Sequence, residues 1–140
     1  MKKDLKIFNE VNGFKVQRKR LFDVFESFRE FERVKYRFVV NLIFIDEKKM
    51  ASLNEDWKGK KGSTDVLSFM YEDVGDEVFG EIYICDKVAI RNALEAGVKP
   101  LDEIASLFAH GLLHLKGYTH ETDEKYEKMM KKMMKIVGKS

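Results

Sequence analysis

The chain has 140 residues, of which 44% are hydrophobic and 36% are charged, and its formal net charge is +2. This length and composition predict one globular domain over residues 1–140 and exclude a disordered chain. A net charge this close to zero excludes a general polycationic coat for nucleic acid. Apolar runs stay well below the roughly 20 residues that cross a bilayer, and the N-terminus lacks an apolar secretory segment. We therefore expect a cytoplasmic protein with no membrane partner.

The first half of the chain predicts strands alternating with helices. Alternating apolar residues over 4–11 predict a strand, and apolar residues spaced by three and four over 16–34 predict an amphipathic helix. A run of β-branched and aromatic residues over 37–45 predicts a buried strand. Asp46 is expected to cap a short helix that ends near Leu53.

The second half begins with a flexible basic loop over 57–63 that contains two glycines. Two strands are predicted next, over 64–70 and 78–85, with an acidic loop over 72–77 between them. Three helices complete the chain, over 86–95, 100–116 and 122–137. This order predicts an α+β fold, with a small, mostly mixed four-stranded sheet and about five surrounding helices.

All the histidines of the chain lie in one short segment, as His110, His114 and His120. Side chains four residues apart share a helix face, with Cβ atoms about 5–6 Å apart, so the first two imidazoles can reach one ion. Gly117 permits a left-handed turn that brings the third histidine toward the pair. Three imidazole ligands with one open position are typical of catalytic zinc. We therefore predict one Zn²⁺ per chain, on a central helix and the turn that follows it.

The spacing of the histidines equals that of the long zinc motif in metzincin proteases. In those enzymes the residue after the first histidine is a glutamate that acts as general base, whereas here it is Gly111. Zinc-bound water can still ionise near neutral pH, so hydrolytic chemistry is expected and peptide cleavage is disfavoured. A peptidase-like hydrolase would need a carboxylate from elsewhere, and Glu103 is the nearest candidate in sequence.

The segment HGLLHLKGYTH at 110–120 resembles the HGxLHLxGYDH signature of the YbeY family, which comprises bacterial rRNA maturation factors and single-strand-specific endoribonucleases. Further blocks match in order and spacing, at 53–54, 57–69 and 80–84, so the resemblance covers nearly the whole chain. It implies an α+β fold with a small mixed sheet and zinc bound by the three histidines. It also implies a zinc-dependent, single-strand-specific endoribonuclease that acts in maturation of the 16S rRNA 3′ end and in ribosome quality control. The implied partners are single-stranded RNA, ribosomal RNA or a ribosomal subunit.

The chain departs from the family pattern at three positions. Lys58 stands where the family usually has arginine, which keeps the charge but loses the planar fork that grips a phosphate at two points. Ser63 replaces a usual proline, so the loop is less constrained. Thr119 replaces a usual aspartate, which removes a carboxylate next to the third histidine.

We predict that the basic loop lies across from the metal and follows the RNA backbone. The predicted catalytic residues are Lys58 and His114, and the predicted substrate-binding residues are Lys58, Lys60, Lys61, Thr64 and Asp65. Trp57 or Tyr118 could stack a base, although Trp57 could instead pack at the base of the loop. Asp65 could orient a ligand or a water, or have only a structural role.

A non-catalytic ribosome assembly factor is the remaining alternative. Such a protein would use zinc structurally and would need a fourth protein ligand. The single cysteine, Cys85, is the only thiol that could serve. Its position in a predicted strand favours a small buried hydrophobic residue instead, and a lone cysteine excludes an intramolecular disulfide.

Overall fold

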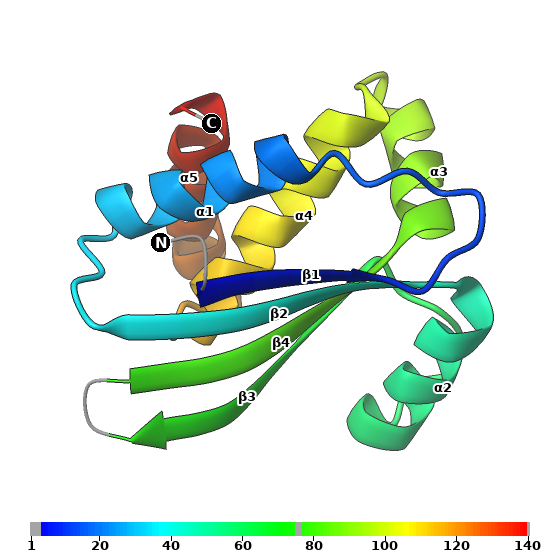
Figure 1. The fold of residues 1–140 in the computed structure, drawn as a ribbon, viewed down its shortest axis with the longest axis horizontal. Coiled ribbons are helices and arrows are strands. Elements are labelled where there is room, and N and C mark those ends of the chain that lie inside the picture. Colours follow the sequence, from blue (N-terminus) through cyan, green and yellow to red (C-terminus); the bar gives the residue numbers. More distant parts are fainter. Residues whose placement is uncertain (1–3, 75–76, 140) are drawn as a thin grey trace.

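The computed structural model describes residues 4–74 and 77–139, which form a four-stranded sheet and five helices (Figure 1). The strands are β1 (Leu5–Asn9), β2 (Arg37–Ile45), β3 (Val66–Val74) and β4 (Glu77–Cys85). The helices are α1 (Arg18–Phe31), α2 (Glu47–Lys58), α3 (Asp86–Ala96), α4 (Pro100–Leu115) and α5 (Asp123–Lys139). The predicted α+β class is therefore confirmed.

The sheet is mixed, with strand order β1-β2-β4-β3. Strand β2 pairs in parallel with both β1 and β4, while β3 and β4 form an antiparallel hairpin. Helix α1 makes the crossover between the parallel neighbours β1 and β2, as a parallel connection requires. The hairpin places β3 at the sheet edge, where it borders the site described below.

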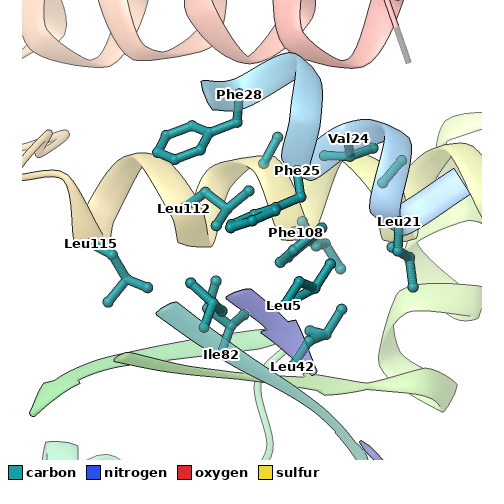
Figure 2. Packing of buried hydrophobic residues seen from close by; sticks show 14 of the residues in the cluster. Leu5, Leu21, Val24, Phe25, Phe28, Leu42, Ile82, Phe108, Leu112 and Leu115 are labelled. Carbon is teal, nitrogen blue, oxygen red and sulfur yellow. The ribbon is translucent and has the colours of Figure 1, made fainter. Parts of the chain in front are cut away.

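Helix α4 lies between the sheet and α1, and α5 packs on the same side (Figure 1). Helix α4 is buried on most of its circumference, because it contacts helices on one side and strands on the other. Figure 2 shows Phe108 and Leu112 of α4 between Phe25 of α1 and the strand residues Leu42 and Ile82. Burial of this kind contributes roughly 1.5–3 kcal/mol for each large apolar side chain. The helix that carries two of the histidines is thus held in the centre of the core.

A second, smaller core lies between α2 and the opposite face of the sheet. Its buried members are Ile43, Ile45, Met50, Leu67 and Cys85. The prediction that the cysteine is a buried hydrophobic residue is confirmed, since Cys85 is fully buried. In the described ranges, no helix combines the length and the apolar character needed to span a membrane.

Two predicted boundaries were wrong. Asp46 caps the start of α2, as predicted. The helix continues to Lys58 instead of ending near Leu53, because the residue that ends it is Gly59, with φ 67°. Trp57 and Lys58 therefore lie in a helix and not in the loop. The predicted acidic loop over 72–77 is largely strand, since β3 runs to Val74 and β4 begins at Glu77, while residues 75–76 lie outside the described residues. Cross-strand pairing outweighs the low strand propensity of the acidic residues.

Candidate metal centre and cleft

The three histidines meet at one point, at the C-terminal end of α4 and in the turn after it. The Nε2 atoms of His110 and His114 are 2.9 Å apart. Ligand atoms from these two and from His120 all lie within 4.8 Å of one another. A zinc ion with Zn–N bonds of about 2.0–2.1 Å in tetrahedral geometry separates its ligand atoms by roughly 3.3 Å, so this donor set could hold a metal ion with small adjustments.

The turn that brings His120 back is a Schellman motif. The amide of Gly117 donates to the carbonyl of His114, and the amide of Tyr118 donates to the carbonyl of Leu113, both at 3.0 Å. Gly117 has φ 110°, a conformation that strains any residue with a Cβ atom. The glycine that ends the helix thus also reverses the chain, as the sequence indicated.

The backbone fixes the proton position on His114. Its Nδ1 lies 3.0 Å from the carbonyl oxygen of Tyr118, which can only accept a hydrogen bond, so Nδ1 carries the proton. The lone pair of Nε2 is then directed at the centre of the histidine cluster. A backbone carbonyl supplies the orienting contact that ligating histidines need, without the carboxylate that Thr119 replaces.

Electrostatics keep two of these imidazoles neutral. Burial lowers the pKa of His110 from 6.5 to about 4, and the charges of His114 and His120 add to this effect. Burial also lowers the pKa of His114, where the hydrogen bond with Tyr118 opposes the shift and the charges of His120 and Lys58 add to it. Neutral imidazole is the form that binds a metal.

Gly111 explains why a metzincin-type base is absent. A Cβ atom at this position would lie 2.9 Å from two carbon atoms of Ile82, which is fully buried in β4. The residue after the first histidine therefore faces the sheet rather than the histidine cluster. A glutamate here would enter the hydrophobic core, so the glycine permits close packing of the helix and does not simply replace a catalytic residue.

A cleft of about 560 Å³ opens beside the histidines, between the end of α4 and the segment joining α2 to β3. Among its lining residues are four of the predicted substrate-binding residues and all three histidines: Lys58, Lys60, Thr64, Asp65, His110, His114 and His120. Lys61 is exposed and, within the described part of the chain, is not among the lining residues. The structure thus brings together two regions that are about 50 residues apart in sequence.

The basic segment is held by one buried amide and one carboxylate. Asn54 is 6% exposed, and its Nδ2 donates to the carbonyl of Gly62 at 2.9 Å, so this buried amide holds the loop against the end of α2. The Asp65 carboxylate accepts hydrogen bonds from the amide of Val66 at 2.8 Å and from Nδ2 of Asn92 at 3.2 Å. Asp65 therefore anchors the start of β3 to α3 while it also borders the cleft.

The two aromatic candidates for base stacking have different surroundings. Trp57 is 69% exposed, and its ring makes an edge contact with Phe69, with 6.0 Å between the ring centroids. Tyr118 packs against the main core, and its hydroxyl donates to Glu32 at 2.6 Å. Among the described residues neither ring lines the cleft, but the Trp57 ring is exposed whereas Tyr118 is packed against the core, so Trp57 is the one with a face available to stack a base.

Neither the structural zinc site, which needs a fourth protein ligand, nor the peptidase-like hydrolase, which needs a carboxylate base, is supported by the described side chains around the histidines. In the described ranges, the group of side chains that could hold a metal contains only the three histidines. Cys85 lies in the second core beneath α2, where burial raises the pKa of its thiol. Within the same described residues, Glu103 neither joins this group nor lines the cleft. One position on a bound ion would remain open.

Glu32, which was not among the residues predicted from the sequence, contacts the turn after α4. Its side chain is 3% exposed and lies at the C-terminal end of α1. Lys116 and Lys132 approach the carboxylate at 3.3 and 3.0 Å, in addition to the Tyr118 hydroxyl. No sequence motif identifies this residue, because its partners lie 84 to 100 positions further along the chain.

Comparison with known proteins supplies the last observation. The family described as "Endoribonuclease YbeY" matches residues 6–140. Curated relatives with the name Endoribonuclease YbeY include one from Neisseria meningitidis, 36% identical over 97 residues, which are 64% of this chain and 57% of that protein. Another, from Spiroplasma citri, is 29% identical across 99% of this chain and 94% of its own length. The chain is aligned with little more than half the length of the Neisseria relatives.

A solved structure agrees with the fold. The solution structure of a Thermotoga maritima protein superimposes with a TM-score of 0.64 at 32% identity, covering 96% of this chain and 89% of the other. The similarity therefore extends over nearly the whole chain.

Proposed function

This chain belongs to the YbeY family, and we propose that it is a zinc-dependent endoribonuclease that cuts single-stranded RNA. The observation that carries the proposal is the juxtaposition in one cleft of three histidines and the basic residues Lys58 and Lys60. The proposed biological role is maturation of the 16S rRNA 3′ end and ribosome quality control, with ribosomal RNA or a ribosomal subunit as partner. This role rests on the family resemblance.

Zinc is the metal that this donor set favours. Imidazole nitrogen is a borderline ligand that suits zinc, whereas Mg²⁺ and Ca²⁺ prefer oxygen. The proposed ligands are His110, His114 and His120, with one ion per chain. Zinc held there would lower the pKa of a bound water and polarise a phosphate oxygen. The proposed catalytic role of His114 is to hold this ion, with its Nδ1–H fixed by the Tyr118 carbonyl.

The cleft residues would place the RNA backbone beside the ion. Lys58 lines the same cleft as the histidines, so its ammonium could neutralise a phosphate that binds beside the ion. Lys60 would hold an adjacent phosphate, and the Thr64 hydroxyl could donate to the backbone. Asp65 is proposed to limit the depth at which an anionic strand binds. Lys61 would contribute only long-range charge from outside the cleft.

Stacking of a base on Trp57 would give the proposed preference for a single strand. Its exposed indole lies in the last turn of α2 and directly precedes Lys58, so a base could stack there while its phosphate contacts the lysine. Base–aromatic stacking contributes about 1–3 kcal/mol, and bases paired within a duplex are not available for it. The amphipathic side chain of Lys58 lies over Phe69, with its Nζ 5.2 Å from the ring centroid, which keeps the ammonium near the indole.

Cleavage of end-labelled RNA by purified protein tests the proposal, with His114→Ala prepared in parallel and Lys87→Ala, a surface substitution on α3, as the control. We expect wild type and control to cut single-stranded RNA, to spare duplex RNA, and to lose activity with a chelator and regain it with zinc. His114→Ala should be at least about 100-fold less active, because two imidazoles hold zinc poorly. Equal cutting by wild type and His114→Ala would show that a contaminant is responsible. Absence of cutting by a zinc-loaded protein would favour the assembly-factor alternative.

A further inference from the structure

Glu32 is an unusual residue to bury where it lies. It follows the last turn of α1, where the helix dipole disfavours a negative charge, and its side chain is only 3% exposed. Burial alone would raise the pKa of the carboxyl, but hydrogen bonds from Tyr118 and Lys132, with the charges of Lys132 and Lys116, lower it below its ordinary value. The carboxylate is therefore charged at neutral pH and is fully engaged by its partners.

These partners come from two other elements. Tyr118 and Lys116 belong to the segment after α4, and Lys132 belongs to α5. Both ammonium groups also lie over the Tyr118 ring, with Nζ atoms 5.8 and 5.1 Å from its centroid. The tyrosine is thus fixed at its hydroxyl by Glu32 and across its ring by two cations. Its ring cannot move without breaking this arrangement.

The opposite end of Tyr118 contacts the histidine cluster. Its carbonyl oxygen accepts the Nδ1–H of His114 at 3.0 Å, and the chain reaches His120 two residues later. Helix α4 itself positions His110 and His114, since both lie inside it. The position of His120 depends on the turn instead, and the turn is fixed to the rest of the protein through Tyr118.

We propose that Glu32 is a positioning residue of the histidine cluster, which holds Tyr118 so that its carbonyl orients His114 and its turn presents His120. This inference rests on the proposed metal centre. Among the described residues Glu32 contacts neither the histidines nor the cleft, and its effect reaches them through the turn, chiefly through Tyr118 and also through Lys116. Removal of the Glu32 carboxylate should leave His110 and His114 in place on α4. It should make the position of His120 less defined and weaken the preference of His114 for the tautomer with its proton on Nδ1.

Zinc affinity, measured by competition with a chromophoric chelator on metal-free protein, tests this role. Loss of a partner that orients a ligand typically weakens metal binding by about 10–100-fold, and we expect Glu32→Ala to fall in this range. Tyr118→Phe keeps the ring and carbonyl but loses the hydroxyl, so it should show a smaller loss. Glu32→Gln retains an acceptor for the Tyr118 hydroxyl and should restore part of the affinity.

Ser27→Ala is the matched control. Ser27 is buried in α1, and its hydroxyl donates to the carbonyl of Ile136 in α5 at 2.7 Å, so it joins the same two helices as Glu32 and Lys132. In the part of the chain that the structure describes, its hydroxyl bonds to α5 and not to the turn, and its variant should bind zinc within about twofold of wild type. An equal loss in Ser27→Ala and Glu32→Ala would overturn the proposal, because helix docking would then explain both. Wild-type affinity in both Glu32→Gln and Tyr118→Phe would also overturn it, even if Glu32→Ala did not fold.

A measurement on metal-free protein separates this inference from the proposed function. Nitrogen NMR reports whether His114 carries its proton on Nδ1. We expect this tautomer to dominate in wild type and Ser27→Ala, and to lose population in Tyr118→Phe and the Glu32 variants. If wild type bound no zinc, the metal centre would fail as a proposal, and the tautomer would still decide the role of Glu32. An unchanged tautomer in every variant would overturn that role.

Discussion

The two walls of the cleft are built in different ways. The histidine wall consists of α4 and its Schellman turn, and it is supported by the main core, a close helix–sheet contact at Gly111 and the buried Glu32 carboxylate. The lysine wall consists of the end of α2 and the segment up to β3, with exposed ammonium groups and a single buried amide, Asn54. A metal ion needs ligand atoms placed within a few tenths of an ångström, whereas a flexible polyanion can be bound by long, mobile cations. The difference in support matches this difference in required precision.

The largest expected difference between the two walls comes from substitution of a glycine in each of them. A Cβ at Gly111 would lie 2.9 Å from atoms of Ile82, and we expect Gly111→Ala to lower the free energy of unfolding by about 1–3 kcal/mol through overpacking, partly offset by better helix propensity. Displacement of α4 should also weaken zinc binding. Urea unfolding and chelator competition measure the two effects.

Gly62→Ala is the counterpart in the lysine wall. Gly62 has φ 87° with nothing within 4 Å of an added Cβ, so the cost is conformational strain of about 1 kcal/mol without a clash. We expect RNA affinity to fall and zinc affinity to remain unchanged. If Gly62→Ala weakened zinc binding as much as Gly111→Ala, the two walls would not be independent.

The same contrast explains what the sequence could predict. The histidine wall could be predicted from local sequence signals. These are the spacing of His110 and His114 on a helix and the glycine at 117 that ends this helix. The range of α2 was wrong because its end depends on Gly59 adopting a left-handed conformation and on Asn54 bonding to Gly62, which are choices that helical periodicity does not encode. Glu32 was missed because its role arises only when α1, α5 and the turn pack together.

Lysine substitutions sharpen the comparison with a smaller effect. Lys60 lines the cleft and its neighbour Lys61 does not, so the two residues form a matched pair of equal charge. We expect Lys60→Ala to weaken single-stranded RNA binding by about 3–10-fold and to reduce the slope of log K against log salt by about 0.7, the value for one phosphate contact on a single strand. Lys61→Ala should change affinity by less than about twofold. Fluorescence of Trp57, the single tryptophan, can report binding in both variants.

Equal slopes for the two lysine variants would contradict the cleft as the path of the RNA. Zinc affinity should be the same in both variants and in wild type, because neither lysine contacts a histidine in the described residues. A change in zinc affinity would show that the lysine wall supports the metal after all.

Glu103 gives the smallest expected effect, and it tests whether charge acts between α4 and the start of β3. Burial raises the pKa of its carboxyl above 4.5, and the charge of Asp65 adds to this. The folded state therefore holds the Glu103 proton more tightly than the unfolded state, so the stability from this group is complete below pH 4.5 and is lost as pH rises through the folded pKa. Glu103→Gln removes this loss and should be more stable than wild type at pH 7, with the gain disappearing below pH 4.5. Adding Asp65→Asn should reduce the gain in stability, because one cause of the raised Glu103 pKa is then gone.

Thermal unfolding at pH 4 and pH 7 measures the gain in stability of Glu103→Gln. A gain of the same size at pH 4 and pH 7 would show that side-chain shape, not charge, is responsible.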